Sequence, residues 1–353
     1  MNISFLIDKS QTFQMIAEIL LESSRRGYYS TVYSFCNKDV LNFSDLDSSK
    51  NINFLKFSNL NDLIECHREN RDKFDASVGI NFFNERWHNF YKNNPATNYA
   101  LEYCWNELYK SHNSSVKDVT LFCNSKWTHE KIKEIGGHDN ITFLGSPWFQ
   151  FIKRFKSDKR KGYAVFMAPH DQYFLRHKNF SDRFLKIVKI IRLCCNSLGI
   201  DLILKSRRKF SQNYEKLGLF DSAVYDDSTF EHLTLFSNSS IVFNFCSSAV
   251  NELSFVETPF ICLFPDLHLL LRDYEKDTFK AMQLINKKYY HDIFDNIHCA
   301  GISTLEINED KLLEKINYLT HSQKDWSKFQ NLHFPGNHDR SAARILDYIG
   351  ERT

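Results

Sequence analysis

Apolar runs and helical repeats alternate along the first half of the chain. Short apolar runs rich in β-branched and aromatic residues predict strands at residues 3–7, 28–35, 52–57 and 76–80. Apolar positions at helical spacing predict helices at residues 12–26, 60–70 and 95–109. Because strands that alternate with helices form parallel sheets, we expect a sheet with helices on both faces.

One segment in the middle of the chain predicts where this first sheet ends. An apolar strand at residues 119–123 meets Asn-Ser at 124–125, which is a helix-entry signal. Gly-Gly at 136–137 ends that helix, because glycine reaches the left-handed conformation that a helix stop needs. A short strand at 141–144 follows, and Gly-Ser-Pro at 145–147 prevents further pairing. The first layer therefore closes near residue 147.

The second half repeats the alternation. It predicts strands at residues 163–167, 200–204, 241–245 and 260–264. It predicts helices at residues 182–198, 230–236 and 249–256, with closing helices at 312–319 and 341–348. We expect an α/β protein with two domains, at residues 1–155 and 156–335, and a closing helix at 336–353. Two such layers that face each other predict a central cleft.

Composition narrows the class of protein. The chain has 353 residues, of which 42% are hydrophobic and 25% charged, as in ordinary globular proteins. A net charge of +2 argues against a general nucleic-acid binder. Nine cysteines without a C-x-x-C pair argue against a metal site or a disulfide framework. Asp8 and Lys9 interrupt the first apolar run, and no run approaches the ~18–20 apolar residues of a membrane span, so we expect a cytoplasmic protein.

Residues 240–263 contain the sharpest local signal. A buried strand leads to Ser247 and Ser248, where a helix begins that carries Asn251 and Glu252 in its first turn. Unpaired N–H groups at a helix start attract phosphate, and a carboxylate one turn later can accept from both hydroxyls of a ribose. Ligands of parallel sheets bind at the carboxyl ends of strands. The alternative is that the serines only cap the helix and Glu252 completes a capping box.

This order of a strand, SSAVNEL and ETPFICL resembles the carboxyl-terminal domain of GT-B nucleotide-sugar enzymes. The families that look most similar are capsule and lipopolysaccharide glycosyltransferases, including CDP-glycerol and Kdo transferases, and UDP-GlcNAc 2-epimerases. The likeness extends to ITFLGSPWF, similar to their interdomain crossing, and to PGNHDRSAARILDYI, similar to their closing helix. It implies two Rossmann-like domains facing a central cleft, with the acceptor in the first domain and the nucleotide donor in the second.

The resemblance also implies roles for single residues. Ser247, Ser248 and Glu252 match the donor-phosphate turn and the ribose contact. Lys205 and Arg207 match a basic position after the second strand of the donor domain, although Lys-Ser-Arg-Arg stands here where the families often have Lys-x-His-Pro. An arginine can clamp a pyrophosphate through paired donors. A structural salt bridge is the alternative for these two cations.

Another segment bears on the choice between the two families. His170 follows the first strand of the second half and is a further donor-binding candidate. The segment from Arg176 is similar to the HRxENxG helix entry of the 2-epimerases, but Lys178 stands in place of Glu and Ser181 in place of Gly. Their HxEAG context in the first domain has no clean match, which weakens the epimerase interpretation.

Four residues of the first domain are candidates for the general base. Asp8, Glu85, His88 and Glu102 have suitable side chains, and the spacing singles out none of them. The alternative for Glu102 is a solvated residue on the helix predicted at 95–109.

From these observations we expect a GT-B-like glycosyltransferase that moves a sugar or related group from a nucleotide-activated donor to a surface-glycan or lipid-linked acceptor. The donor is a substrate, so we expect no cofactor, and Asp45 and Asp47 lie in a polar loop that does not favour a metal site. Basic clusters leave open a peripheral contact with the inner face of the membrane. The alternatives are a UDP-GlcNAc 2-epimerase or hydrolase, and a noncatalytic protein that binds nucleotide sugars.

Overall fold

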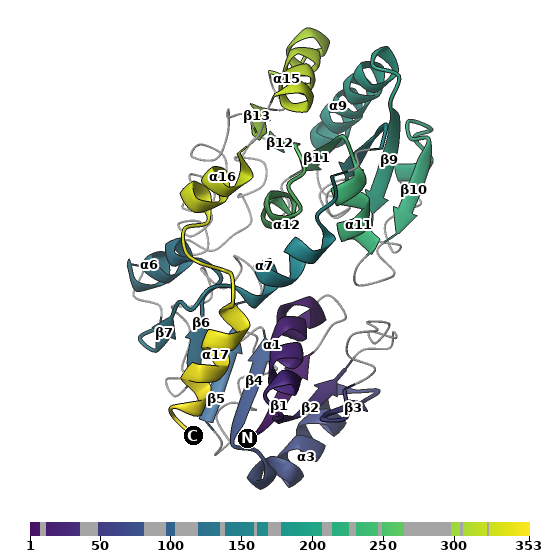
Figure 1. The fold of residues 1–353 in the computed structure, drawn as a ribbon. Helices are drawn as coiled ribbons and strands as arrows, with labels where there is room; N and C mark the ends of the chain where they lie inside the picture. Colours follow the sequence, from purple (N-terminus) through teal and green to yellow (C-terminus); the bar gives the residue numbers. More distant parts are fainter. Residues whose placement is uncertain are drawn as a thin grey trace. The chain divides into compact units, whose positions relative to one another are not determined.

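The chain folds into two compact units in a computed structural model. The model describes residues 1–7, 12–35, 49–80, 97–102, 119–134, 138–158, 161–168, 178–206, 214–225, 231–245, 249–264, 298–303, 306–322 and 325–353. Unit 1 comprises Met1–Ile152 together with Phe334–Thr353, and unit 2 comprises Lys153–His333. Each unit contains a parallel sheet accompanied by helices (Figure 1).

Unit 1 has a seven-stranded sheet in the order β3-β2-β1-β4-β5-β6-β7. Every neighbouring pair of these strands is parallel, and β1 pairs with both β2 and β4 in the middle of the sheet. The strands are β1 (Asn2–Ile7), β2 (Tyr29–Ser34), β3 (Ile52–Lys56), β4 (Ala76–Ile80), β5 (Thr97–Leu101), β6 (Val119–Phe122) and β7 (Ile141–Thr142).

The helices of unit 1 include one that returns from the end of the chain. They are α1 (Phe13–Arg25), α3 (Leu60–Asn70), the short 3-10 helix η2 (Arg71–Lys73), α6 (Lys126–Glu134), α7 (Pro147–Ile152) and α17 (Ser341–Gly350). Helix α1 packs against both α7 and α17, and Figure 1 shows α17 beside α1. Ile345, Leu346 and Ile349 of α17 are fully buried, so this last helix is part of the core of unit 1.

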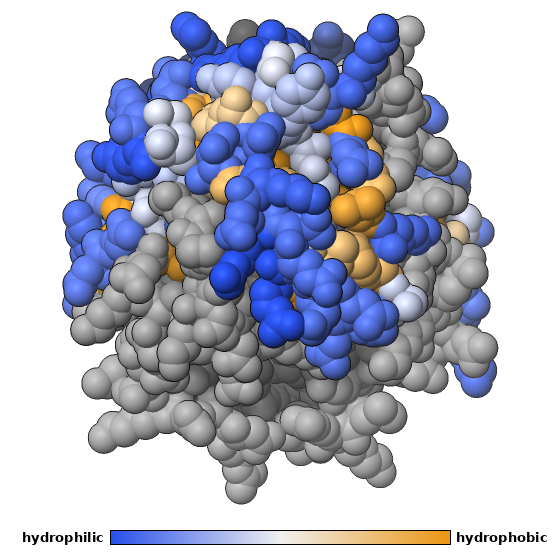
Figure 2. All heavy atoms as spheres, turned by 90° about the horizontal axis from the view of Figure 1, so that it is seen from below, coloured by the Kyte–Doolittle hydropathy of each residue, from blue (hydrophilic) through white to orange (hydrophobic). Residues whose placement is uncertain are grey.

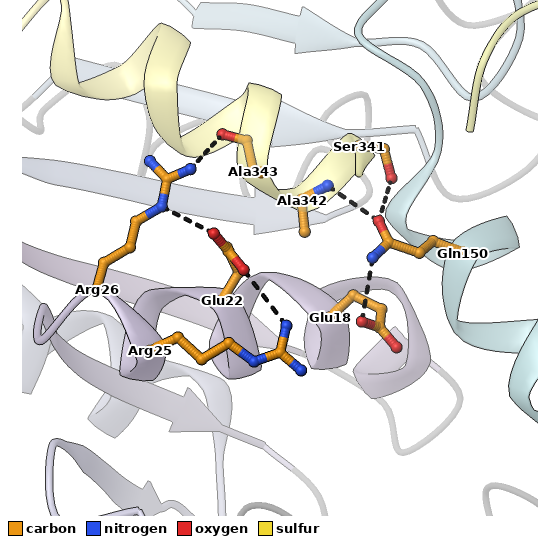
Figure 3. A network of polar contacts seen from close by, with 8 residues as sticks. All are labelled: Glu18, Glu22, Arg25, Arg26, Gln150, Ser341, Ala342 and Ala343. Carbon is orange, nitrogen blue, oxygen red and sulfur yellow. Dashed lines mark hydrogen bonds and ion pairs between the residues drawn. The ribbon is translucent and has the colours of Figure 1, made fainter. Parts of the chain in front are cut away.

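Hydrogen bonds connect helices α1, α7 and α17 to one another (Figure 3). The side-chain oxygen of Gln150 on α7 accepts from the hydroxyl of Ser341 at 2.9 Å and from the amide of Ala342 at 3.2 Å. Its amide nitrogen donates to Glu18 on α1 at 3.3 Å. Arg26, directly after α1, donates to the carbonyl of Ala343 at 3.2 Å. The bond from the Ala342 amide to Gln150 satisfies an N–H at the start of α17 that has no partner within the helix.

The sequence prediction was wrong at one element of this sheet. Residues 97–101, expected within a helix at 95–109, form strand β5 between β4 and β6. Tyr99, Ala100 and Leu101 are all buried, because a central strand is covered on both faces and loses the alternation that marks an exposed strand. The rest of that expected helix, residues 95–96 and 103–109, lies outside the described part of the chain, as does the Gly-Gly stop at 136–137.

Gly-Ser-Pro at 145–147 starts a helix as well as ending the sheet. Pro147 is the first residue of α7, where its missing N–H has no helical partner to lose. The hydroxyl of Ser146 accepts from the amide of Phe149 at 3.3 Å and so caps the helix. The prediction did not include α7.

Unit 2 has a six-stranded parallel sheet in the order β10-β9-β8-β11-β12-β13. The strands are β8 (Tyr163–Met167), β9 (Asp201–Ser206), β10 (Ser222–Tyr225), β11 (Ile241–Phe245), β12 (Phe260–Phe264) and β13 (Cys299–Ser303). The helices are the 3-10 helix η4 (Lys153–Phe155), α9 (Lys178–Ser197), α11 (Glu231–Asn238), α12 (Val250–Phe255), α15 (Glu309–His321) and α16 (Trp326–His333). Apart from β10, β13 and α16, these strands and α-helices confirm the predicted ones.

The core of unit 2 forms where helices cover the strands. Phe184, Val188 and Ile191 of α9 are buried with Leu202 and Leu204 of β9. Their spacing along α9 follows the helical repeat, which explains why periodicity alone located this helix. Helix α15 packs against α9 and adds to the same core.

The described helices include none that is long and apolar enough to cross a membrane. Where residues are described, the face in Figure 2 carries mainly hydrophilic side chains, with hydrophobic areas among them. The strands and helices of the two units determine where the candidate site residues lie.

Candidate functional site

The carboxyl ends of the parallel strands are where the candidate side chains should gather, because that edge of an open sheet receives ligands. Four of the predicted site residues can be placed there or next to it: Glu102, Lys205, Asn251 and Glu252. The remaining candidates lie outside the described residues: Asp8, Glu85, His88, His170, Arg207, Ser247 and Ser248.

Glu102 directly follows β5 and is 3% exposed, so it is not the solvated helix residue that was considered as an alternative. Its carboxylate oxygen Oε2 accepts from the backbone amide of Asn124 at 2.7 Å. The side-chain amide of Asn124 donates back to the Glu102 carbonyl at 2.6 Å. Asn124 follows β6, the neighbouring strand, and this two-point contact holds the carboxylate at the carboxyl edge of the sheet of unit 1.

A chain of buried hydrogen bonds continues from Asn124. The hydroxyl of Ser146 donates to Asn124 Oδ1 at 2.8 Å, and the amide of Ser146 donates to Nδ1 of His338 at 3.1 Å. Because Nδ1 accepts, the ring proton lies on Nε2, which donates to the carbonyl of Phe334 at 3.0 Å. The contact therefore indicates a neutral His338. Glu102 is thus linked to both the Gly-Ser-Pro segment and the returning PGNHD segment.

Two glycines allow these segments to meet. Gly145 has φ +91°, and a Cβ there would lie 2.5 Å from the carbonyl oxygen of Asn337. Gly336 has φ +129°, and a Cβ there would lie 2.2 Å from the ring of Phe143. Both conformations favour glycine, and neither position has room for a side chain.

Cys123 lies next to this network and is not a candidate nucleophile. Burial, together with the negative charge of Glu102, raises the pKa of the Cys123 thiol well above its usual value. A thiol acts as a nucleophile only when deprotonated, so Cys123 is inert at neutral pH. Among the groups described at this edge, the Glu102 carboxylate has the chemistry of a general base.

In unit 2, Glu252 lies in the first turn of α12, the helix that follows β11. It is 8% exposed, and its Oε1 lies 3.4 Å from Nε2 of His232, which is 7% exposed and lies in the first turn of α11. Asn251, 5% exposed, precedes Glu252, and its buried Oδ1 has no hydrogen-bond partner among the residues that the structure describes. A buried carboxylate, amide and imidazole thus belong to two helices whose starts follow β10 and β11.

The capping-box alternative for Glu252 meets a difficulty in the structure. Ala249 holds the N-cap position of α12, and no side chain caps the helix there. A capping box needs Ser or Thr at the N-cap, three residues before the Glu. The described contact of Glu252 instead runs to His232 on the neighbouring helix.

Lys205 lies near the end of β9, opposite Met167 of β8 and Val224 of β10. It is half-buried, and its Nζ lies 6.0 Å from the centre of the Phe236 ring on α11. At that distance a cation interacts weakly with an aromatic face. Within the described residues, no cluster of His, Cys, Asp and Glu could hold a metal ion.

Sequence reasoning missed His232 and His338, and it treated Asn124 only as a helix-entry signal and Ser146 only as part of the Gly-Ser-Pro stop. Asn124 and Ser146 did carry a signal, since Asn124 lies directly after the strand predicted at 119–123 and Ser146 lies two residues after the strand predicted at 141–144. The two histidines carried none, because their partners are 20 and 192 residues away in the chain.

Comparisons with known proteins bear on the fold. The sequence matches no protein-family model and no curated protein. Similar solved structures include the UDP-GlcNAc 2-epimerase of Methanocaldococcus jannaschii, with a TM-score of 0.61 and 13% identity over 99% of this chain and 100% of that one. A glycosyltransferase from Rickettsia africae has a TM-score of 0.54 and 12% identity, covering 99% of this chain and 98% of that one.

A third similar structure is Anabaena HepE in complex with UDP-glucose, with a TM-score of 0.53 and 10% identity over 100% of this chain and 99% of that one. At such identities the likeness establishes the fold, and it spans essentially the whole chain. The resemblance inferred from SSAVNEL, ETPFICL and the Gly-Ser-Pro segment is confirmed at this level. The chain therefore has the GT-B fold, the architecture that it shares with UDP-GlcNAc 2-epimerases and nucleotide-sugar glycosyltransferases.

Proposed function

We propose that this protein is a glycosyltransferase that moves a sugar or related group from a nucleotide-activated donor to a glycan or lipid-linked acceptor, without a metal. The observation that carries the proposal is the placement of buried carboxylates. Glu102 follows β5 of unit 1, and Glu252 lies in the first turn of α12, the helix after β11 of unit 2. Buried acids are rare unless they are paired or serve a function, and both lie by strand ends where α/β sheets bind ligands.

Unit 2 would bind the donor. The Glu252 carboxylate would accept hydrogen bonds from the ribose hydroxyls, and Lys205 would contribute positive charge toward the phosphates. His170, Arg207, Ser247 and Ser248 are proposed further contacts. These donors would stabilise the leaving phosphate through charge and hydrogen bonding.

Unit 1 would bind the acceptor and supply the base. The Glu102 carboxylate would take the proton of the acceptor hydroxyl as that oxygen bonds to the anomeric carbon of the donor sugar. The bond from the anomeric carbon to the phosphate oxygen breaks in the same step, and the nucleotide leaves with that electron pair. The backbone amide of Asn124 donates to Oε2 of this carboxylate and holds it at the carboxyl edge of the sheet. Asp8 and His88 are proposed as further catalytic candidates.

The first prediction concerns donor binding. Glu252→Ala should weaken the binding of the donor nucleotide at least tenfold, because a charged acceptor of two hydroxyl groups is lost. Isothermal titration calorimetry with UDP, CDP, CMP and GDP measures this and identifies the preferred base. Glu314→Ala, an exposed residue on α15, is the control and should bind like the unaltered protein. Unchanged affinity in Glu252→Ala would show that the ribose is not bound there.

A second function is supported by a specific observation. Several similar structures are UDP-GlcNAc 2-epimerases, so an epimerase or hydrolase on the same fold is the alternative. Incubation with UDP-GlcNAc and no acceptor separates the two, since release of UDP with an altered sugar would favour the epimerase. Binding of nucleotide without turnover over a broad panel of donors and acceptors would instead favour a noncatalytic binding protein.

A further inference from the structure

His232 and Glu252 form a buried pair between two helices of unit 2. Helix α11 follows β10 and helix α12 follows β11, and the two helices pack against each other. His232 is the second residue of α11 and Glu252 the third of α12, so both lie in the first turn. Their side chains are 7% and 11% exposed, and Nε2 of the histidine lies 3.4 Å from Oε1 of the glutamate.

The chemistry of the two groups decides the direction of the contact. An ionised carboxylate can only accept hydrogen bonds. Nε2 of His232 therefore carries a hydrogen atom and donates the hydrogen bond to Glu252. The imidazole ring is also held from its own helix, because it meets the Phe236 ring edge-on at 5.7 Å between centres. A donor fixed in this way restricts the rotation of a glutamate side chain that would otherwise have three free torsions.

From this arrangement we infer that His232 is a positioning residue for the donor site: it orients the Glu252 carboxylate for the hydroxyl pair of a nucleoside ribose. The inference rests on the proposed function. A carboxylate has about four acceptor positions, so a bond from His232 to Oε1 leaves capacity for ribose hydroxyls. His232 would act through Glu252, and its contribution would be lost when Glu252 is absent.

Two variants of His232 test this role by their affinity for UDP, or for whichever of CDP, CMP and GDP binds tightest to the unaltered protein. His232→Leu should lower the affinity about tenfold, the usual worth of a hydrogen bond to a charged group. His232→Gln should retain most of the affinity, because its amide nitrogen lies near the position of Nε2 and can donate in the same direction. Melting temperatures are measured alongside, so that a loss of fold is recognised.

The decisive measurement is a double-mutant cycle with Glu252→Ala. If His232 acts through Glu252, His232→Leu weakens binding in the unaltered protein and has no further effect in the Glu252→Ala background. Equal effects in both backgrounds, or a Gln variant as weak as the Leu variant, would overturn the inference. His67→Leu, which removes a buried histidine from unit 1, is the control and should leave UDP affinity unchanged.

The cycle also separates failure of the inference from failure of the proposed function. If Glu252→Ala lowers affinity while His232→Leu does not, the donor site stands and the role of His232 is refuted. If Glu252→Ala leaves the affinity unchanged, or if none of the four nucleotides binds to the unaltered protein, the donor site itself is refuted and the inference with it.

Discussion

At the scale of single residues, the structure depends on a few positions whose backbone conformation or buried side chain restricts which residue can stand there. Gly145 combines a left-handed backbone with contact to the returning segment, and Gly27 has φ +70° with open space around it. His67 on α3 is buried against β1 and β4, where its Nε2 lies 2.9 Å from the hydroxyl of Ser4. Variants at these residues separate the effects of backbone conformation, packing space and side-chain charge on the stability of the protein.

Gly145→Ala should destabilise unit 1 by about 2–4 kcal/mol, because backbone strain and overpacking combine there. The added Cβ would lie 2.5 Å from a backbone oxygen, which cannot move aside as a flexible side chain would. Gly27→Ala adds the strain alone and should cost only about 1–2 kcal/mol. Urea unfolding at neutral pH measures both variants. Equal losses would mean that the contact at Gly145 relaxes without strain.

His67 predicts an acid-dependent loss of stability. Burial lowers the pKa of His67 from its ordinary 6.5 to about 4. A folded-state pKa below the unfolded value means that the contribution is fully present above pH 6.5 and is lost as the pH falls toward 4. Between pH 7 and pH 5 the free energy of unfolding should fall by about 2 kcal/mol from this group. The measurement is urea unfolding at both pH values.

The variant His67→Gln isolates this contribution, because glutamine has no proton to bind in this range. Its stability at pH 7 is lower, but the difference between pH 7 and pH 5 should shrink by about 2 kcal/mol relative to the unaltered protein. An unchanged pH dependence in the variant would assign the acid sensitivity to other groups.

At the scale of elements, most helices and strands follow from local pattern and one helix depends on a distant partner. Helix α17 begins at Ser341 after Arg340, which has φ +59° and provides no side-chain cap. The cap comes from Gln150 of α7, about 190 residues earlier in the chain (Figure 3). The start of α17 is therefore stabilised by tertiary contact in place of a local N-cap residue.

Gln150→Ala should destabilise unit 1 by about 1–2 kcal/mol, because it removes the acceptor for two donors at the start of α17 and the donor to Glu18. Among the α17 amides, hydrogen exchange should increase most at Ala342, whose N–H donates to Gln150. Arg25→Ala is the control, since the Arg25 side chain is 65% exposed and should change stability by less than about 0.5 kcal/mol. A uniform increase of exchange over the whole chain would contradict a local cap.

At the scale of the whole molecule, the chain forms two α/β units, and its last 20 residues, Phe334–Thr353, return to the first. The two sheets follow the same rule, in which each new strand pairs in parallel and helices cover the faces. The GT-B fold identified by comparison agrees with this arrangement over nearly the full length. The donor-site prediction belongs to unit 2 and the base at Glu102 to unit 1, so each can be tested by variants of its own unit.

Much of the fold could be predicted, because the local pattern of apolar and polar residues predicts most of its helices and strands. Helices such as α9 and α15 bury one face at helical spacing, and strands such as β8 and β11 are short apolar runs. Strand β5 could not be predicted, since residues 97–101 have no clean strand pattern and became a strand only by pairing with β4 and β6. In the candidate site, Glu252 was predictable from its place after a strand, whereas His232 was found only in the structure.

The sequence by itself determined most of the strands and helices, the existence of two α/β layers and the candidate carboxylates, because these depend on residues close together in the chain. Only the tertiary structure decided that Glu102 is buried against Asn124, that His338 accepts from Ser146, and that His232 meets Glu252. Such contacts join segments that are far apart in the chain. Burial and pairing are set by where the packed sheet brings those segments together, and no local pattern encodes that geometry.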